Sequence, residues 1–396
     1  MLPLLESLPF ELDQFTLLER LATGGMADVY LAIEHGTDDH PAGASPRWVA
    51  VKRIRADLVE HREFVEYFMI EGRLSLACHH PHLPTAFHLG HAADRPYLAL
   101  EYIAGPTVLA LCRAATRRRD PIAVPAVLAI GLAAARALDH LHGLTDLDGR
   151  ALEVIHRDVT PQNLLVAPGG VVKLIDFGVA RTTFQSHRTE VGVIKGKYAY
   201  IAPEQLDRNR TVDQRADLFS LGVVIHELLT GQPLFHGASD LDTTERVKAA
   251  PIPNPTSMRA DVPAEISEVV LTALARDPDQ RWPSAASLVD ALERAAESTA
   301  TWPWPARLAR EVANLVGTPR LPVLAGGQVT WRAEIAPPIG PERDDDDVTP
   351  VIEVRNQAGR WEAPNVPADP QLSYFLNAGA VENPWQGSDS TDVTKI

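Results

Sequence analysis

The chain contains 396 residues, of which 45% are hydrophobic, so it is long enough to bury a large core. Its formal net charge of −15 argues against nonspecific binding to nucleic acid and to anionic membrane surfaces. Two cysteines, Cys78 and Cys112, are too few for a disulfide framework and favour a reducing compartment. The first residues lack the basic region and long apolar core of a secretory signal, so we expect a cytoplasmic protein.

The first element that the apolar pattern predicts is a buried helix at residues 123–135. This run is the best candidate for a membrane span, but it stops at Arg136 and is too short to cross a bilayer. Farther along, two short apolar runs, residues 154–155 and 171–175, are typical of buried strands. A polar motif follows each run at once, so we expect these strands to deliver loops to a site.

The first of these motifs, at residues 156–163, reads His-Arg-Asp-Val-Thr-Pro-Gln-Asn, and the second is Asp176-Phe177-Gly178. Phosphoryl transfer requires an acceptor hydroxyl, the nucleotide phosphates and magnesium to be held in one line. Asp158 can orient the acceptor hydroxyl and accept its proton. Asn163 and Asp176 offer the oxygen ligands that hard divalent cations select. The two motifs therefore predict a phosphoryl-transfer site.

At these motifs the chain resembles the eukaryotic-type (Hanks-type) protein kinases, and it is most similar to a bacterial cytoplasmic Ser/Thr protein kinase. A single His-Arg-Asp triplet would mean little, because short motifs recur by chance. Further family motifs, however, follow in the family's order and cover roughly residues 14–297. These motifs are Trp48 to Lys52, Glu71, Ala202-Pro203-Glu204, Asp217 to Gly222, and Arg281.

The resemblance implies an α+β, two-lobed protein-kinase-like fold. A small β-rich N-lobe is expected over residues 14–104 and a larger, mostly helical C-lobe over residues 105–297. An N-terminal extension, residues 1–13, would precede the kinase domain, and a tail, residues 298–396, would follow it. The resemblance further implies ATP and Mg²⁺, or Mn²⁺, as cofactors.

Single residues acquire roles from the same resemblance. Asp158 and Lys52 would be catalytic, with Glu71 as the ion-pair partner of Lys52, and Asn163 and Asp176 would hold the metal. The residues implied to contact ATP are Ala22, Thr23, Gly24, Gly25, Met26, Ala27, Val29, Ala50, Lys52, Leu100, Glu101, Ile103 and Leu165.

The expected phosphate-binding loop departs from the family pattern. The family has three glycines there, because glycine lets the backbone approach the phosphates closely. This chain keeps only the middle one, Gly24, with Ala22 and Ala27 at the outer positions. We expect a stiffer and weaker phosphate cover, not a blocked one.

A second departure concerns one positive charge. Ser/Thr kinases carry a lysine two residues after the catalytic Asp, where this chain has Thr160. They also carry a threonine after a glycine near the end of the activation segment, where this chain has Lys197. Our hypothesis is that the two residue types are exchanged, so that Lys197 supplies the missing charge to the γ-phosphate and is catalytic. The alternative is that Lys197 points to solvent or to an acidic substrate.

Arg157 implies regulation by phosphorylation. In the family, an arginine before the catalytic Asp pairs with a phosphorylated residue of the activation segment and orders that segment. Thr189 is the first candidate for autophosphorylation, and Thr182 and Thr183 follow. The alternative is that these hydroxyls merely suit a loop.

The tail differs in composition from the rest of the chain. It holds twelve of the 32 prolines and an acidic run, Asp344 to Asp347, so we expect a disordered or docking tail that is rich in proline and acidic residues. Short strands could pair there around residues 329–335 and 351–354. Thr349, beside the acidic run, could serve a partner that reads phosphothreonine.

Two function classes remain open. The first is an ATP-dependent protein Ser/Thr kinase that acts on protein substrates and autophosphorylates, with a homodimer as one route to transfer in trans. The second is a nucleotide-binding pseudokinase or scaffold that works through its tail. A tyrosine kinase is less well supported, because the chain lacks that group's Arg-rich and Trp-containing patterns. A histidine cluster at residues 79–91 lacks the second ligand group that a zinc site needs.

Overall fold

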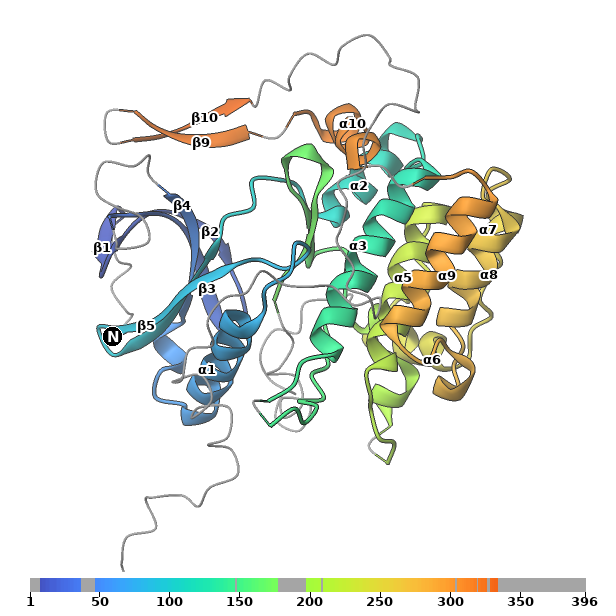
Figure 1. Cartoon of the computed structure of the whole chain (residues 1–396), viewed down its shortest axis with the longest axis horizontal. Helices are drawn as coiled ribbons and strands as arrows, with labels where there is room; N and C mark the ends of the chain where they lie inside the picture. The colour runs from blue at the N-terminus through green and yellow to red at the C-terminus, as the bar shows by residue number, and fades with distance from the viewer. Residues whose placement is uncertain are drawn as a thin grey trace, which may run out of the picture.

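The computed structural model describes residues 8–36, 47–146, 148–176, 197–207, 209–302, 305–318, 320–325 and 328–333. These residues form a β-rich N-lobe and a mostly helical C-lobe (Figure 1), which confirms the predicted two-lobed fold. Residues 102–107 join the last strand of the N-lobe sheet to the first helix of the C-lobe.

The N-lobe is built on a six-stranded antiparallel sheet with the order β1-β2-β3-β4-β6-β5. The strands are β1 (Phe10–Leu12), β2 (Phe15–Thr23), β3 (Ala27–Glu34), β4 (Arg47–Ile54), β5 (Ala86–Ala92) and β6 (Arg95–Glu101). The sheet begins inside the segment expected as an N-terminal extension, because Leu12 of β1 is buried in the sheet's own core. The unbroken register of β3 on β4 places Val29 opposite Lys52.

One helix, α1 (Arg62–Ala77), packs on the N-lobe sheet. Gly72 allows this close approach, because a Cβ atom at that position would lie 2.6 Å from Cδ1 of Leu89 in β5. The helix thereby buries Phe68 and turns Glu71 toward the interior.

The C-lobe surrounds a central helix, α3 (Val124–His142), which packs against α5 and α9. The other α-helices of this lobe before residue 300, among the residues that the structure describes, are α2 (Val108–Arg118), α5 (Arg215–Thr230), α6 (Asp240–Ala249), α7 (Pro255–Met258), α8 (Ala264–Ala273) and α9 (Ala285–Ser298). Among the helices that the structure describes, α3 alone is long and apolar enough to cross a bilayer, and most of it is buried in the C-lobe. The helix predicted at residues 123–135 is therefore confirmed as part of a core helix.

Only one of the two predicted buried strands exists. Residues 171–175 contain β8 (Val172–Leu174), which pairs with β7 (Leu164–Val166). Residues 154–155 belong to no strand. The prediction is wrong there because the next two backbone N–H groups, of His156 and Arg157, donate to the carboxylate of Asp217 instead of to a neighbouring strand.

The helical tail segment packs on the C-lobe. Helix α10 (Pro305–Val316) buries Leu308, Val312 and Leu315 and contacts α2, α3 and the short 3₁₀ helix η2 (Pro168–Gly170). The hairpin of β9 (Arg320–Ala325) and β10 (Gln328–Ala333) follows it. The strand expected around residues 329–335 thus pairs with residues 320–325, and the expected partner, residues 351–354, lies outside the described part of the chain.

Three histidine rings of the predicted cluster and of α3 lie together. The ring centroid of His80 is 5.4 Å from that of His82 and 5.2 Å from that of His140. Burial lowers the pKa of His80 to about 3 and that of His82 to about 4. Within the described ranges no group of His, Cys, Asp and Glu side chains is arranged to hold a metal ion.

Acidification from pH 6.5 to 5 is expected to lower the free energy of unfolding. The unfolded chain takes up a proton on each of these histidines near pH 6.5, whereas folded His80 and His82 stay neutral to about pH 4, so unfolding absorbs protons and becomes easier as the pH falls. Urea denaturation at several pH values measures this slope. The variant His80→Asn/His82→Asn should show a flatter slope, and an unchanged slope would contradict the account.

Candidate active site

Lys52 lies at the centre of the site, where it joins the sheet, α1 and the segment after β8. Its Nζ is 2.5 Å from Oε1 of Glu71 and 2.9 Å from Oδ1 of Asp176. Burial alone would lower the pKa of Lys52, but the charges of Asp176 and Glu71 outweigh it and raise the pKa above its ordinary value. The ammonium group is therefore charged and held between two carboxylates.

Asp217, at the start of α5, organises the loop of residues 156–163. Its carboxylate accepts the backbone N–H groups of His156 and Arg157 at 2.8 and 2.7 Å and contacts Nε2 of His142 at 2.8 Å. Arg157 has a φ of 62°, a left-handed conformation that these bonds hold in place. Burial disfavours the Asp217 carboxylate, yet His142, the ring of His156 and the N–H of Arg157 hold its pKa below the ordinary value.

The same loop places Asp158 and Asn163 beside Asp176. Nδ2 of Asn163 donates to the carbonyl of Asp158 at 2.9 Å, and the N–H of Ile175 donates to the carbonyl of Asn163 at 2.8 Å. Asp158 and Asn163 are buried, whereas Asp176 is exposed and has a φ of 59°. The structure therefore brings together the candidate base and both candidate metal ligands. Phe177 and Gly178 lie outside the described residues.

The expected phosphate-binding loop is the tight turn between β2 and β3. The N–H of Gly24 donates to the carbonyl of Ala27 at 2.8 Å, and a Cβ atom at Gly24 would lie only 3.0 Å from that oxygen. Ala22 pairs with Val29, and Thr23 with Asp28. The two alanines thus stand in strands, and the turn itself consists of Gly24, Gly25 and Met26.

The adenine-side residues lie where β6 leaves the sheet. Leu100 pairs with Ala50 of β4, Glu101 ends β6, and Ile103 is buried just beyond it. Leu165 belongs to β7, which bridges to Thr107 at the start of α2. The strand end and β7 therefore remain the candidates for the apolar walls that an adenine ring needs.

Lys173 joins the end of β6 to β8, the strand that precedes the candidate metal ligand Asp176. Sequence reasoning missed this contact. The buried Nζ donates to Oε2 of Glu101 at 2.7 Å and to the carbonyl of Leu83 at 3.1 Å. Lys173 stands in β8, three residues before Asp176. A lysine inside an apolar strand was the available signal, because buried lysines require a partner.

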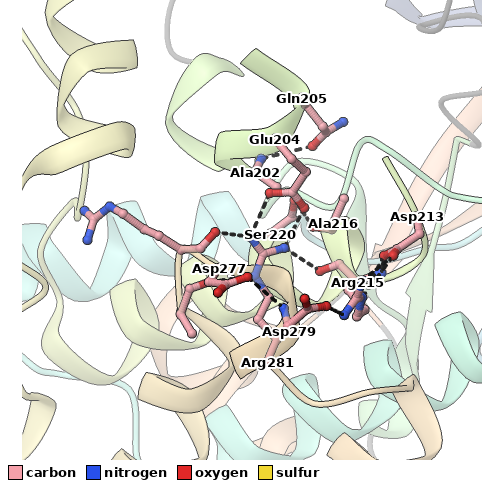
Figure 2. A network of polar contacts seen from close by, with 12 residues as sticks. Ala202, Glu204, Gln205, Asp213, Arg215, Ala216, Ser220, Asp277, Asp279 and Arg281 are labelled. Carbon is pink, nitrogen blue, oxygen red and sulfur yellow. Dashed lines mark hydrogen bonds and ion pairs between the residues drawn. The ribbon is translucent and has the colours of Figure 1, made fainter. Parts of the chain in front are cut away.

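A buried ion pair anchors the end of the expected activation segment to the C-lobe. Arg281 donates to Oε1 and Oε2 of Glu204 at 2.6 and 2.7 Å, and the two side chains are 0% and 2% exposed. Figure 2 shows the two side chains pointing toward each other, in a network that also contains Ala202, Ser220 and Arg215. Arg281 also donates to the backbone carbonyls of Arg215, Ala275 and Arg276.

Of the two residues in the proposed charge exchange, the structure describes Thr160 fully but Lys197 only in its backbone. Thr160 is 2% exposed, and its hydroxyl has no hydrogen-bond partner among the residues that the structure describes. Lys197 begins the 3₁₀ helix η4 (Lys197–Tyr200), but its side chain lies outside the description. Thr182, Thr183 and Thr189 also lie outside the described residues.

Comparison with known proteins gives one consistent family. The protein kinase domain matches residues 15–292. The tyrosine-protein kinase MasK of Myxococcus xanthus is 38% identical over 279 residues, which cover 70% of this chain and 42% of MasK. The serine/threonine-protein kinase PknB of Mycolicibacterium smegmatis is 35% identical over 297 residues, which cover 73% of this chain and 44% of PknB.

A solved structure matches as well. The kinase domain of PknI from Mycobacterium tuberculosis aligns with a TM-score of 0.52 and 26% sequence identity, over 73% of this chain and 98% of that domain. The chain spans less than half the length of the two curated relatives, so the likeness concerns their kinase domains.

Proposed function

Because the chain belongs to the protein kinase family, we propose that it transfers the γ-phosphate of ATP to Ser and Thr hydroxyls of proteins, including its own. The observation that carries the proposal is the position of Lys52, which contacts Glu71 and Asp176 at the same time. This arrangement places Lys52, which would hold the phosphates, in contact with Asp176, which would hold the metal. The relatives named serine/threonine-protein kinase support the choice of acceptor.

The residues present fit ATP and Mg²⁺ or Mn²⁺. The nitrogen of the Asn163 side chain is committed to the carbonyl of Asp158, so its oxygen is the atom that can ligate a cation. Asp176 would supply the second ligand, and Lys52 would hold the α- and β-phosphates. When bound, the metal neutralises negative charge that develops on the phosphates.

Asp158 would act on the acceptor. Its backbone is fixed by the bond from Asn163 and by the N–H of Asp158 itself, which donates to Nδ1 of His156. The carboxylate can then orient a Ser or Thr hydroxyl and accept its proton as the phosphoryl group leaves ATP. Asp217 keeps the loop in this conformation and is a positioning residue.

The regulatory part of the proposal rests on the resemblance and on Arg157. A phosphorylated Thr189, Thr182 or Thr183 would pair with Arg157 and order the activation segment. Transfer between two copies of the chain and a tail partner that reads phosphothreonine belong to the same proposal. A cytoplasmic location also stays a prediction.

Lys197→Ala is expected to lower kcat by about 100-fold at saturating ATP, which is the typical cost of removing one group that stabilises transition-state charge. Support comes from the buried Thr160 hydroxyl, which needs a polar partner. The nearby Lys195→Ala variant is the matched control and should keep its kcat. A Lys197→Ala enzyme with a wild-type kcat would contradict the exchange.

Acceptor choice is tested with three peptides that differ only in one residue, Thr, Ser or Tyr. The proposal predicts transfer to the Thr and Ser peptides and at most a few per cent of that rate to the Tyr peptide. The name of MasK makes tyrosine specificity the second candidate, and preferred transfer to the Tyr peptide would establish it. ATP binding without transfer to any peptide or to the chain itself would instead favour the pseudokinase alternative.

A further inference from the structure

A cavity of about 640 Å³ lies beside the end of the expected activation segment, outside the catalytic residues. It opens between the 3₁₀ helix η5 (Pro203–Leu206), the C-terminal end of α6 and the turn after α8. The cavity is lined by Pro203, Leu206, Asp207, Arg210, Lys248, Arg276 and Asp277.

Arg276 is the fixed cation of this cavity. Its Nε donates to the carbonyl of Val247 at 3.0 Å, and a terminal nitrogen donates to the carbonyls of Ala250 and Arg246 at the end of α6. Over the described ranges Arg276 pairs with carbonyls alone and with no carboxylate. Burial lowers its pKa, so its charge is poorly solvated and a carboxylate brought into the cavity would compensate it.

The two other cations of the lining are exposed to solvent and pair with nearby acids. Arg210 and Lys248 are exposed, and their partners Asp207 and Glu245 lie 3.8 and 3.0 Å away on the same short segments. Water screens such local pairs, so both cations can turn to an incoming anion at little cost.

The two acidic residues that line the cavity, Asp207 and Asp277, already accept hydrogen bonds from backbone N–H groups. Asp207 accepts the N–H of Asn209 at 3.0 Å, and Asp277 accepts that of Asp279 at 3.1 Å. The lining therefore contains three cationic side chains and two acidic ones, which leaves it with an excess positive charge. Pro203 and Leu206 add an apolar surface beside them.

We propose that this cavity is a docking site for an acidic segment of the protein substrate, which places carboxylates on Arg210, Lys248 and Arg276 and an apolar side chain on Leu206. The proposal rests on the proposed kinase function. It deepens that function because η5 is anchored to the C-lobe by the Glu204–Arg281 pair, and Asp217 of the same lobe holds the loop of Asp158. A segment docked here therefore has a fixed position relative to the catalytic Asp158.

Fluorescence anisotropy with a labelled Ala-Asp-Asp-Asp-Asp-Leu-Ala peptide tests the docking without any phosphoryl transfer. The full chain should bind this peptide at least about tenfold more tightly than the peptide with Asn in place of Asp. Arg210→Glu/Lys248→Glu should weaken binding about tenfold or more. Arg117→Glu/Arg294→Glu makes the same change in net charge on exposed positions of α2 and α9, and it should leave binding within twofold. Equal loss in both variants, or no preference for the acidic peptide, would overturn the proposal.

Kinetics separate this proposal from the proposed function. For a Thr acceptor peptide that carries the acidic block, Arg210→Glu/Lys248→Glu should raise KM about tenfold and leave kcat unchanged. The same variant should leave both constants unchanged for an acceptor without the block. Failure of the wild-type chain to phosphorylate either acceptor would count against the proposed function, while the anisotropy result would still decide the docking site.

Discussion

Lys52→Met is expected to reduce phosphoryl transfer by about 1,000-fold, because it removes the cation that would hold the α- and β-phosphates. It also removes the ion pair that ties Glu71 of α1 to Asp176 beyond β8. The rate of transfer from γ-labelled ATP to a protein acceptor measures the effect.

The matched control is an exposed ion pair on the same helix. Arg62 and Glu66 of α1 lie 2.7 Å apart with side chains 77% and 56% exposed, so Arg62→Met should change the rate less than twofold. A Lys52→Met chain that retains a tenth or more of the wild-type rate would show that Lys52 is not the phosphate-holding residue.

Arg281→Met is expected to lower the free energy of unfolding by about 3–5 kcal/mol. The substitution leaves the carboxylate of Glu204, which is 2% exposed, buried without its bidentate partner. It also removes the donors to three backbone carbonyls. Urea denaturation of the folded chain measures the loss.

A second variant separates lost packing from an uncompensated charge. Arg281→Met/Glu204→Leu removes both members of the pair and should recover part of the stability, because no buried charge then remains. Nearby, Asp279→Asn breaks an exposed contact with Arg215 and should cost less than about 1 kcal/mol. A double variant that is less stable than Arg281→Met alone would contradict this explanation.

The two-lobed fold could be predicted because the ordered motifs resemble those of the Hanks-type protein kinases, and the residues of these motifs are chemically demanding. Lys52, Glu71 and Asp176 are scattered over the sequence, yet each is of a type that is rarely buried or strained without a specific partner. Asp217 is a further case, since a fully buried carboxylate must find donors and does so in His156 and Arg157.

Features set by packing escaped prediction. The proline-rich composition of the tail concealed α10, although Leu308, Val312 and Leu315 follow a helical spacing and become buried only on contact with the C-lobe. The cavity could not be foreseen either, because Arg210, Lys248 and Arg276 come from three separate segments. No local pattern in the sequence indicates that such segments meet.

For the expected phosphate-binding turn, the sequence could not predict where the strands end. Ala22 and Ala27 were expected to stiffen the loop, and the structure places them in β2 and β3 beside a tight Gly24 turn. How closely this turn covers the phosphates depends on the bound nucleotide and stays a prediction.

The most direct measurement follows the γ-phosphate of labelled ATP into protein, with the full chain beside its Asp158→Asn variant, each with and without Mg²⁺. The account predicts metal-dependent phosphate on Thr or Ser residues of the chain or of an acceptor protein, with a loss of at least about 100-fold in the variant. Metal-dependent transfer that is equal in both chains, or ATP binding with no transfer in either, would contradict the assignment of Asp158 as the base of a protein kinase.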